Sequence, residues 1–212
     1  MRFVLIRHGA SEHSSRGIIA DVAGCTGLTE FGRTQASALV ARLRATGELS
    51  DCGALLSSPA PRARQTAEFL SNALPVGTIE LDDDLREVYP GDAEGLSWEE
   101  YRATYGAFEL HASLNRPFAP RGETWAEFIG RVQTAHQRLA NRFAGRTVVA
   151  VTHAGFVVAS LFVLFDIPWS GRKAYLEPTH TSLTEWRVSG TTWTLMRYND
   201  ASHLHNLALQ GD

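Results

Sequence analysis

The chain is poor in cysteine and has no long hydrophobic run. Its two cysteines, Cys25 and Cys52, stand in no spacing typical of a metal site or a redox motif. Free thiols favour a reducing compartment, so a cytoplasmic location is expected. The longest largely apolar run, Phe156–Phe165, has ten residues and is too short to span a bilayer. The apolar run at the start, Phe3–Ile6, ends in arginine, so no signal peptide and no membrane association are expected.

An excess of positive charge is also absent. The net charge is −3, which gives no basic face for nucleic acid. Hydrophobic residues make up 44% of the 212 residues, enough for one globular domain with a substantial core. We therefore treat residues 1–212 as a single domain, whose oligomeric state the sequence does not indicate.

Short β-branched runs alternate with helical patterns through the first 165 residues. This alternation predicts an α/β fold, a three-layer α/β/α sandwich with a mostly parallel sheet. A final hairpin across Ser189-Gly190 predicts at least one antiparallel strand. The predicted strands are Phe3–Arg7, Ala54–Ser57, Thr78–Leu81, Thr147–His153, Ser182–Val188 and Thr192–Tyr198. The predicted helices are Leu28–Ala45, one opened by Pro59 and Pro61, Trp125–Phe143 and Ala154–Phe165.

The start and the buried face of the first of these helices, Leu28–Ala45, can be predicted from its sequence. Thr29 is a good N-cap residue. Helical spacing then places Phe31, Leu39, Val40 and Leu43 on the inner face.

Residues 88–121 are irregular and aromatic. They predict a small lid-like insertion packed over the C-terminal edge of the sheet. Its aromatic residues have two interpretations: they contact an apolar or ring-bearing part of a ligand, or they pack the insertion onto the sheet. They are Tyr89, Trp98, Tyr101, Tyr105, Phe108 and Phe118.

Two predicted strands end in the same way. "VLIRHG" places Arg7 and His8 at a strand end, and "VVAVTHAG" places His153 there. Ligands of open parallel sheets bind at this edge. "SSPAPRARQTA" adds Arg62 and Arg64 on the first turn of a helix, whose N-terminus attracts anions.

The joint pattern favours a phosphate site. Arginine forks suit phosphate oxygens, and a carboxylate would need fewer donors. Each signal alone is weak, because a strand-end histidine is more often structural and Arg64 is more simply a solvated helix residue.

In this order, the motifs resemble the histidine phosphatase superfamily, in its phosphoglycerate mutase-like branch. The resemblance rests on "LIRHGAS", "LTEFGRTQA", "SSPAPRARQTA", "LREVYPGDAEGLSWEE", "GET" and "VTHAG", which span nearly the whole chain. It implies that His8 is the nucleophile that becomes phosphohistidine. Glu87 would be the proton donor.

The resemblance also implies binding roles and no metal or other cofactor. Arg7, Arg62 and His153 would hold the phosphoryl oxygens, and Ser14 and Ala154 would contribute to substrate binding. The loop Ile18–Gly27 departs from the family pattern, which often has a glutamine-glycine pair and an aspartate here. Substrate choice is therefore not carried over.

The chemistry implied is metal-independent hydrolysis of a small phosphomonoester. Neighbouring arginines would keep His8 neutral for attack, and apolar neighbours would raise the pKa of Glu87. The simpler interpretation of Glu87 is a surface ion pair with Arg86. Two functional alternatives remain: phosphoglycerate mutase-type transfer with the same residues, and an inactive module that binds phosphorylated ligands.

Overall fold

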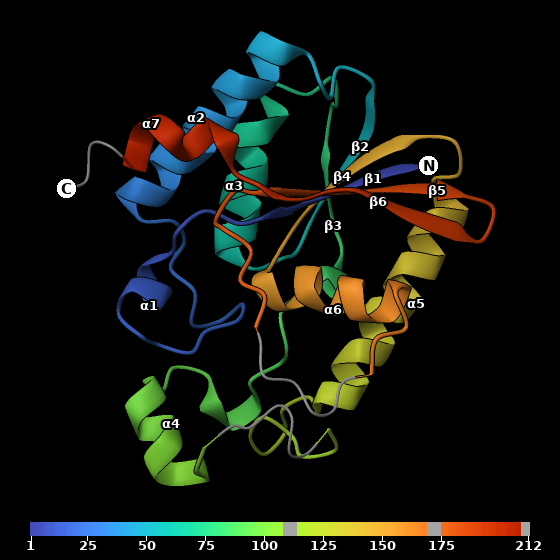
Figure 1. The fold of residues 1–212 in the computed structure, drawn as a ribbon. Coiled ribbons are helices and arrows are strands. Elements are labelled where there is room, and N and C mark those ends of the chain that lie inside the picture. The colour runs from blue at the N-terminus through green and yellow to red at the C-terminus, as the bar shows by residue number, and fades with distance from the viewer. Residues whose placement is uncertain (108–113, 169–174, 209–212) are drawn as a thin grey trace.

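A six-stranded sheet forms the centre of the computed structural model, which describes residues 1–107, 114–168 and 175–208 (Figure 1). The strand order is β3-β2-β4-β1-β5-β6. The bounds are β1 Arg2–Arg7, β2 Cys52–Ser57, β3 Ile79–Leu81, β4 Thr147–Thr152, β5 Leu183–Ser189 and β6 Thr192–Asp200.

The strands β1, β2, β3 and β4 run parallel to one another. β1 pairs with β4, and β2 pairs with both β4 and β3. β5 is antiparallel to β1 and to β6, with which it forms the predicted hairpin. The mostly parallel sheet with an antiparallel strand is thus confirmed. Its consequence is that β1, β2 and β4 all end at the same edge.

Helices cover both faces of the sheet, which confirms the three-layer arrangement (Figure 1). On one face, α2 (Glu30–Thr46) and α3 (Pro61–Ser71) pack on Val4, Ile6 and Val149. On the other, α5 (Trp125–Arg142) and α6 (Ala154–Leu164) pack on Phe3, Leu5, Val148 and Ala150. Both strands are buried on both sides because alternate side chains enter opposite layers.

Helix α2 begins after Thr29, whose side chain accepts a hydrogen bond from the Gly32 amide as predicted. Leu39, Val40 and Leu43 are buried, but the prediction for Phe31 is wrong, since 54% of it is exposed. The buried face of α2 consists of Gly32, Gln35, Ala36, Leu39, Val40 and Leu43. Phe31, one residue before Gly32, points roughly 100° away from the centre of that face.

Residues 88–121 contain α4 (Trp98–Tyr105), which starts with a capping box between Ser97 and Glu100. Tyr101 and Phe118 are buried in a small cluster of their own with Ile19. The segment also joins the loop after α1 through backbone hydrogen bonds, such as that from Ile19 to Leu96. Packing therefore accounts for part of the aromatic content. Phe108 lies outside the described residues.

The remaining helices are short. They are α1 (Glu12–Ser15), α7 (His205–Ala208) and the 3₁₀ turns η1 (Asp83–Leu85), η2 (Gly91–Ala93) and η3 (Ser202–Leu204). Across the described ranges, no helix combines the length and apolarity that a membrane span requires.

Candidate active site

The ends of β1 and β4 and the start of α3 bring His8, His153 and Arg62 together. The two imidazole rings lie 5.1 Å apart between centroids. The Arg62 Nε lies 3.2 Å from His8 Nε2 and 3.2 Å from His153 Nδ1. All three side chains are almost fully buried. The predicted meeting of these residues at one sheet edge is present in the structure.

The hydrogen bonds of His8 fix its tautomer. Its Nδ1 lies 2.7 Å from the carbonyl oxygen of Gly9, which can only accept, so Nδ1 carries the proton. The Nε2 lone pair then faces Arg62 and the cavity. Burial, aided by the charge of Arg62, lowers the pKa of His8 well below 6.5. His8 is therefore neutral at physiological pH, as a nucleophile must be.

His153 is also held neutral, by burial first and Arg62 second, which lower its pKa well below 6.5. Its Nδ1 accepts from Arg62, so its Nε2 is the donor toward Ser58 Oγ at 2.8 Å. Both ring nitrogens are thus occupied by protein groups. Direct contact between His153 and a phosphoryl oxygen stays a prediction.

Arg62 also joins the site to the divergent loop. Its Nη1 donates to the carbonyl oxygens of Ala20 and Asp21, each at 3.1 Å. Arg64, two positions further along α3, has a side chain that is 51% exposed and lies 4.0 Å from Glu68. The structure therefore places at the site Arg62, the arginine that the resemblance selects, and leaves the Arg64 side chain half exposed.

Arg7 follows β1 and reaches the loop before β5. Its guanidinium donates to the carbonyl oxygen of Pro178, while its backbone carbonyl accepts from Thr181. The same loop places His180 against the nucleophile, with 5.6 Å between the ring centroids of His8 and His180. Burial lowers the pKa of His180 to about 4, so this ring is neutral too.

The turn after β1 is fixed by α2 and α3. Gly9 donates from its amide to Thr66, and Ala10 donates to Gln35. Gly32 packs so closely against Ala10 that a Cβ atom at residue 32 would overlap the Ala10 carbonyl. This backbone contact holds the segment that carries His8 in one position.

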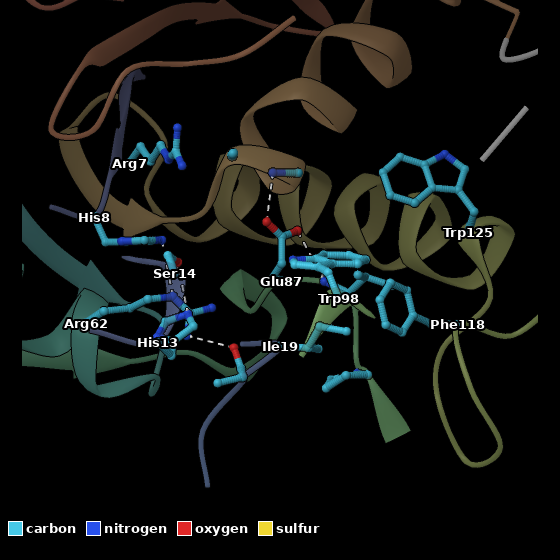
Figure 2. Close-up of a pocket in the computed structure, with 15 residues that line it drawn as sticks. Arg7, His8, His13, Ser14, Ile19, Arg62, Glu87, Trp98, Phe118 and Trp125 are labelled. Carbon is cyan, nitrogen blue, oxygen red and sulfur yellow. Dashed lines mark hydrogen bonds between the residues drawn. The ribbon is translucent and has the colours of Figure 1, made fainter. Parts of the chain in front are cut away.

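Glu87 lies across the cavity from the histidines (Figure 2). Its carboxylate accepts hydrogen bonds from the amides of Gly155 at 2.9 Å and Val88 at 3.2 Å. Burial nevertheless raises the pKa of Glu87, because removal from water penalises the charged form more than these donors favour it.

Two charged residues of the motifs that carry the resemblance, Arg86 and Glu123, each form an ion pair with a residue other than Glu87. Arg86 pairs with Asp21, so the simple Arg86–Glu87 ion pair is not formed. Glu123, the glutamate of the "GET" motif, pairs with Arg131 at 2.7 Å. Glu123 therefore serves the structure of the segment, and Glu87 is the carboxyl group that faces the site.

Arg7, His8, Arg62 and Glu87 line a cavity of about 340 Å³, within the usual range for a small-molecule site, whereas His153 does not line it. Ser14 and Ala154, for which substrate binding stays a prediction, also line it, along with His13. Figure 2 shows Arg7, His8, Arg62 and His13 gathered at one end and Trp98, Phe118 and Trp125 at the other, with Glu87 between them. Within the described residues, no group of three or more His, Cys, Asp or Glu side chains is placed to hold a metal ion.

Three contributors were not anticipated from the sequence: His13, Ser58 and His180. His13 Nε2 lies 3.2 Å from Ser14 Oγ, and burial lowers its pKa to about 4. Ser58 was visible as a polar residue at a strand end, next to the motif that contains Arg62. His180 gave no signal, since it lies in a loop that reaches His8 across most of the chain.

The chain is similar to known proteins both in sequence and in fold. Metal-independent phosphoserine phosphatase of Arabidopsis thaliana is 27% identical, over 96% of this chain and 83% of that protein. Phosphoglycerate mutase-like protein 4 of the same plant is 28% identical, over 95% and 86%. The structure of YhfR from Bacillus stearothermophilus superimposes with a TM-score of 0.82 at 29% identity, covering 96% of this chain and 99% of that one.

The family model for the histidine phosphatase superfamily, branch 1, matches residues 3–201. The matched region contains the two strand-end histidines, Arg62 and Glu87. The chain therefore belongs to branch 1 of the histidine phosphatase superfamily.

Proposed function

We propose that the protein is a metal-independent phosphomonoester hydrolase that works through a phosphohistidine at His8. The observation that carries this proposal is the pairing of a neutral His8, whose Nε2 faces the cavity, with a carboxyl group of raised pKa, Glu87, across it. One group suits attack on phosphorus and the other suits protonation of the leaving oxygen.

In the first step, the phosphoryl group enters beside Arg7 and Arg62. Their guanidinium groups stabilise the charge on the phosphoryl oxygens, a role that magnesium has in other phosphoryl-transfer enzymes. The incoming oxygens replace His8 as the acceptor of the Arg62 Nε hydrogen bond. His8 Nε2 then bonds to phosphorus as the ester P–O bond breaks. Glu87 gives its proton to the departing oxygen, which leaves as an alcohol.

In the second step, water replaces the alcohol at the same position. Glu87, now ionised, takes a proton from this water as its oxygen bonds to phosphorus. The Nε2–P bond breaks, and inorganic phosphate leaves with His8 neutral again. His153 acts on this reaction at least through Arg62, whose Nε it binds.

Hydrolysis is favoured over mutase-type transfer. A mutase must shield the phosphohistidine from water, and in the resemblance mutases carry a larger insertion after the acid. One relative of this chain is named a phosphoserine phosphatase. The free thiols of Cys25 and Cys52 support a cytoplasmic location for the enzyme. We also propose that it is a single domain, with residues 88–121 as a lid-like insertion.

The test is to trap the intermediate. The protein is incubated with a ³²P-labelled ester and quenched in alkali, because phosphohistidine is stable to base and labile to acid. Label on His8, absent from His8→Ala and unaffected by EDTA, is the expected result. Turnover that survives His8→Ala, or that requires an added metal, would overturn the mechanism.

The mutase alternative has its own measurement. 3-Phosphoglycerate is supplied with and without 2,3-bisphosphoglycerate, and phosphate release is compared with isomer formation. Phosphate release without isomerisation is expected for the hydrolase, and the reverse identifies a mutase.

A further inference from the structure

The cavity has a second end that the phosphoryl chemistry does not use. Beyond Glu87 its wall is aromatic and consists of Trp98, Phe118 and Trp125, seen on the right of Figure 2. Ile19, Val88 and Pro90 add further apolar side chains to the lining of the cavity. Because Glu87 stands between the two ends, a substrate that places its bridging oxygen at Glu87 directs the rest of its leaving group toward this wall.

Trp98 is the most exposed member of the wall, with 41% of its surface accessible. Its ring is held in place by edge contacts with Tyr101 and Phe118, at centroid distances of 5.7 and 5.9 Å. A rigid, partly exposed aromatic ring beside a cavity gains from contact with an apolar ligand, because that contact removes both surfaces from water.

The wall offers no cation for a carboxylate. Among the described residues that line the cavity, the basic side chains are all at the phosphoryl end. The arginines in and beside residues 88–121 do not line the cavity. Arg86 pairs with Asp21, Arg121 with Asp92 and Arg131 with Glu123. Arg116 donates to the carbonyl oxygens of Tyr105 and Ala107, and Arg102 is exposed on α4. A carboxylate entering the aromatic end would lose its hydration and find no counter-charge, which is costly.

We propose that the substrate is a phosphomonoester whose leaving group carries an apolar ring or chain, seated against Trp98, Phe118 and Trp125, rather than a carboxylate. This inference rests on the proposed function and specifies its substrate class. The proposed substrate therefore differs from phosphoserine, the substrate in the name of one relative, because phosphoserine carries a carboxylate.

The test compares esters of similar leaving-group reactivity. 2-Phenylethyl phosphate, O-phosphoserine and 3-phosphoglycerate are all esters of primary alcohols, so differences between them report on the aromatic end. We expect kcat/KM for 2-phenylethyl phosphate to exceed both others by about tenfold or more, as burial of a ring predicts.

Two substitutions at Trp98 test the wall itself. Trp98→Ala should lower kcat/KM for 2-phenylethyl phosphate about two- to tenfold, the range for one aromatic contact, and should lower kcat/KM for O-phosphoserine by a smaller factor. Trp98→Arg adds the missing cation and should shift the preference toward the two carboxylates. Phe165→Ala is the matched control, because Phe165 is 50% exposed and lies at the far end of α6 from Ala154, roughly 16 Å along the helix.

Binding gives a readout that does not depend on turnover. Calorimetry with His8→Ala should give a lower Kd for 2-phenylethyl phosphate than for O-phosphoserine. Equal or reversed preference in binding and in kcat/KM overturns the inference while phosphatase activity stands. If no ester is hydrolysed, the proposed function fails, and the two Kd values still decide the inference.

Discussion

The amide of Gly155 donates a 2.9 Å hydrogen bond to Oε2 of Glu87, and no side chain fits between the two residues. A Cβ atom at position 155 would overlap the Glu87 carboxylate. The second residue of α6 must therefore be glycine if the carboxyl group is to stay at the cavity. The glycine of "VTHAG" is explained by this contact across the site.

Gly155→Ala should displace Glu87 without touching the nucleophile. We expect release of a poor alkyl leaving group to slow about ten- to a hundredfold, within the range for loss of a general acid. Release of p-nitrophenol, which needs little protonation, should change much less. Gly130→Ala is the control, since Gly130 lies within α5 with open space around its Cα. Equal slowing of both esters would show that the substitution disturbs more than the acid.

Glu87→Gln tests the protonation state directly. The pKa of Glu87 is raised above 4.5 by burial, so the acid form, which the first step needs, is lost as pH rises through that raised value. Single-turnover release from an alkyl ester should fall with pH in the parent enzyme. Dividing the parent rate by the Glu87→Gln rate at each pH cancels the effect of substrate ionisation, because that effect is common to both enzymes. A ratio that does not change with pH would contradict the assignment.

Local periodicity was sufficient to predict the layers and the catalytic edge. Buried β-branched runs gave β1 and β4, and each delivered its histidine to the same edge because parallel strands end together. Helical spacing put Arg62 and Arg64 about 200° apart, so that only one could face the edge, and the resemblance selected Arg62. The identity of Glu87 came from resemblance, since the sequence alone favoured a pair with Arg86.

Contacts between distant loops were not predictable. His180 reaches His8 through a turn in which Thr181 has a φ of 59°, a conformation with no sequence signature for threonine. Asp21 takes Arg86 away from Glu87 across 65 residues of sequence separation. Phe31 was misplaced because the inner face of α2 is centred on Gly32, Ala36, Leu39 and Leu43, and a residue one position before Gly32 points roughly 100° away from that face.

Arg62→Ala should damage catalysis far more than Arg64→Ala. Arg62 binds both site histidines and two loop carbonyls, whereas the Arg64 side chain is half exposed. We expect a loss of about 10²–10³ in kcat for Arg62→Ala, the scale seen when one preorganised donor is removed. Arg64→Ala should stay within about twofold. Comparable losses from the two would contradict the placement of Arg62, and circular dichroism of each variant checks the fold.

His136 predicts a pH dependence of stability that is separate from catalysis. It is 1% exposed, stacked on Phe156 at 5.4 Å and edge-on to Trp193 at 5.3 Å. Burial lowers its pKa to about 4, against 6.5 in the unfolded chain. Between these values the unfolded state binds more protons, so the free energy of unfolding falls as pH is lowered from 6.5 to 4, by about 3 kcal/mol in total from this group.

His136→Leu removes this titrating group and puts an apolar side chain at the same position in the core. Urea unfolding at several pH values should show a shallower loss of stability from pH 6.5 to 4 in this variant, whatever its stability at pH 7. Gln137→Leu, at the next and exposed position of α5, adds a leucine without removing a titrating group. It should shift the free energy of unfolding equally at every pH. An unchanged slope in His136→Leu would mean that the folded and unfolded chains bind the same number of protons at this site, so that the core tolerates the charged imidazole.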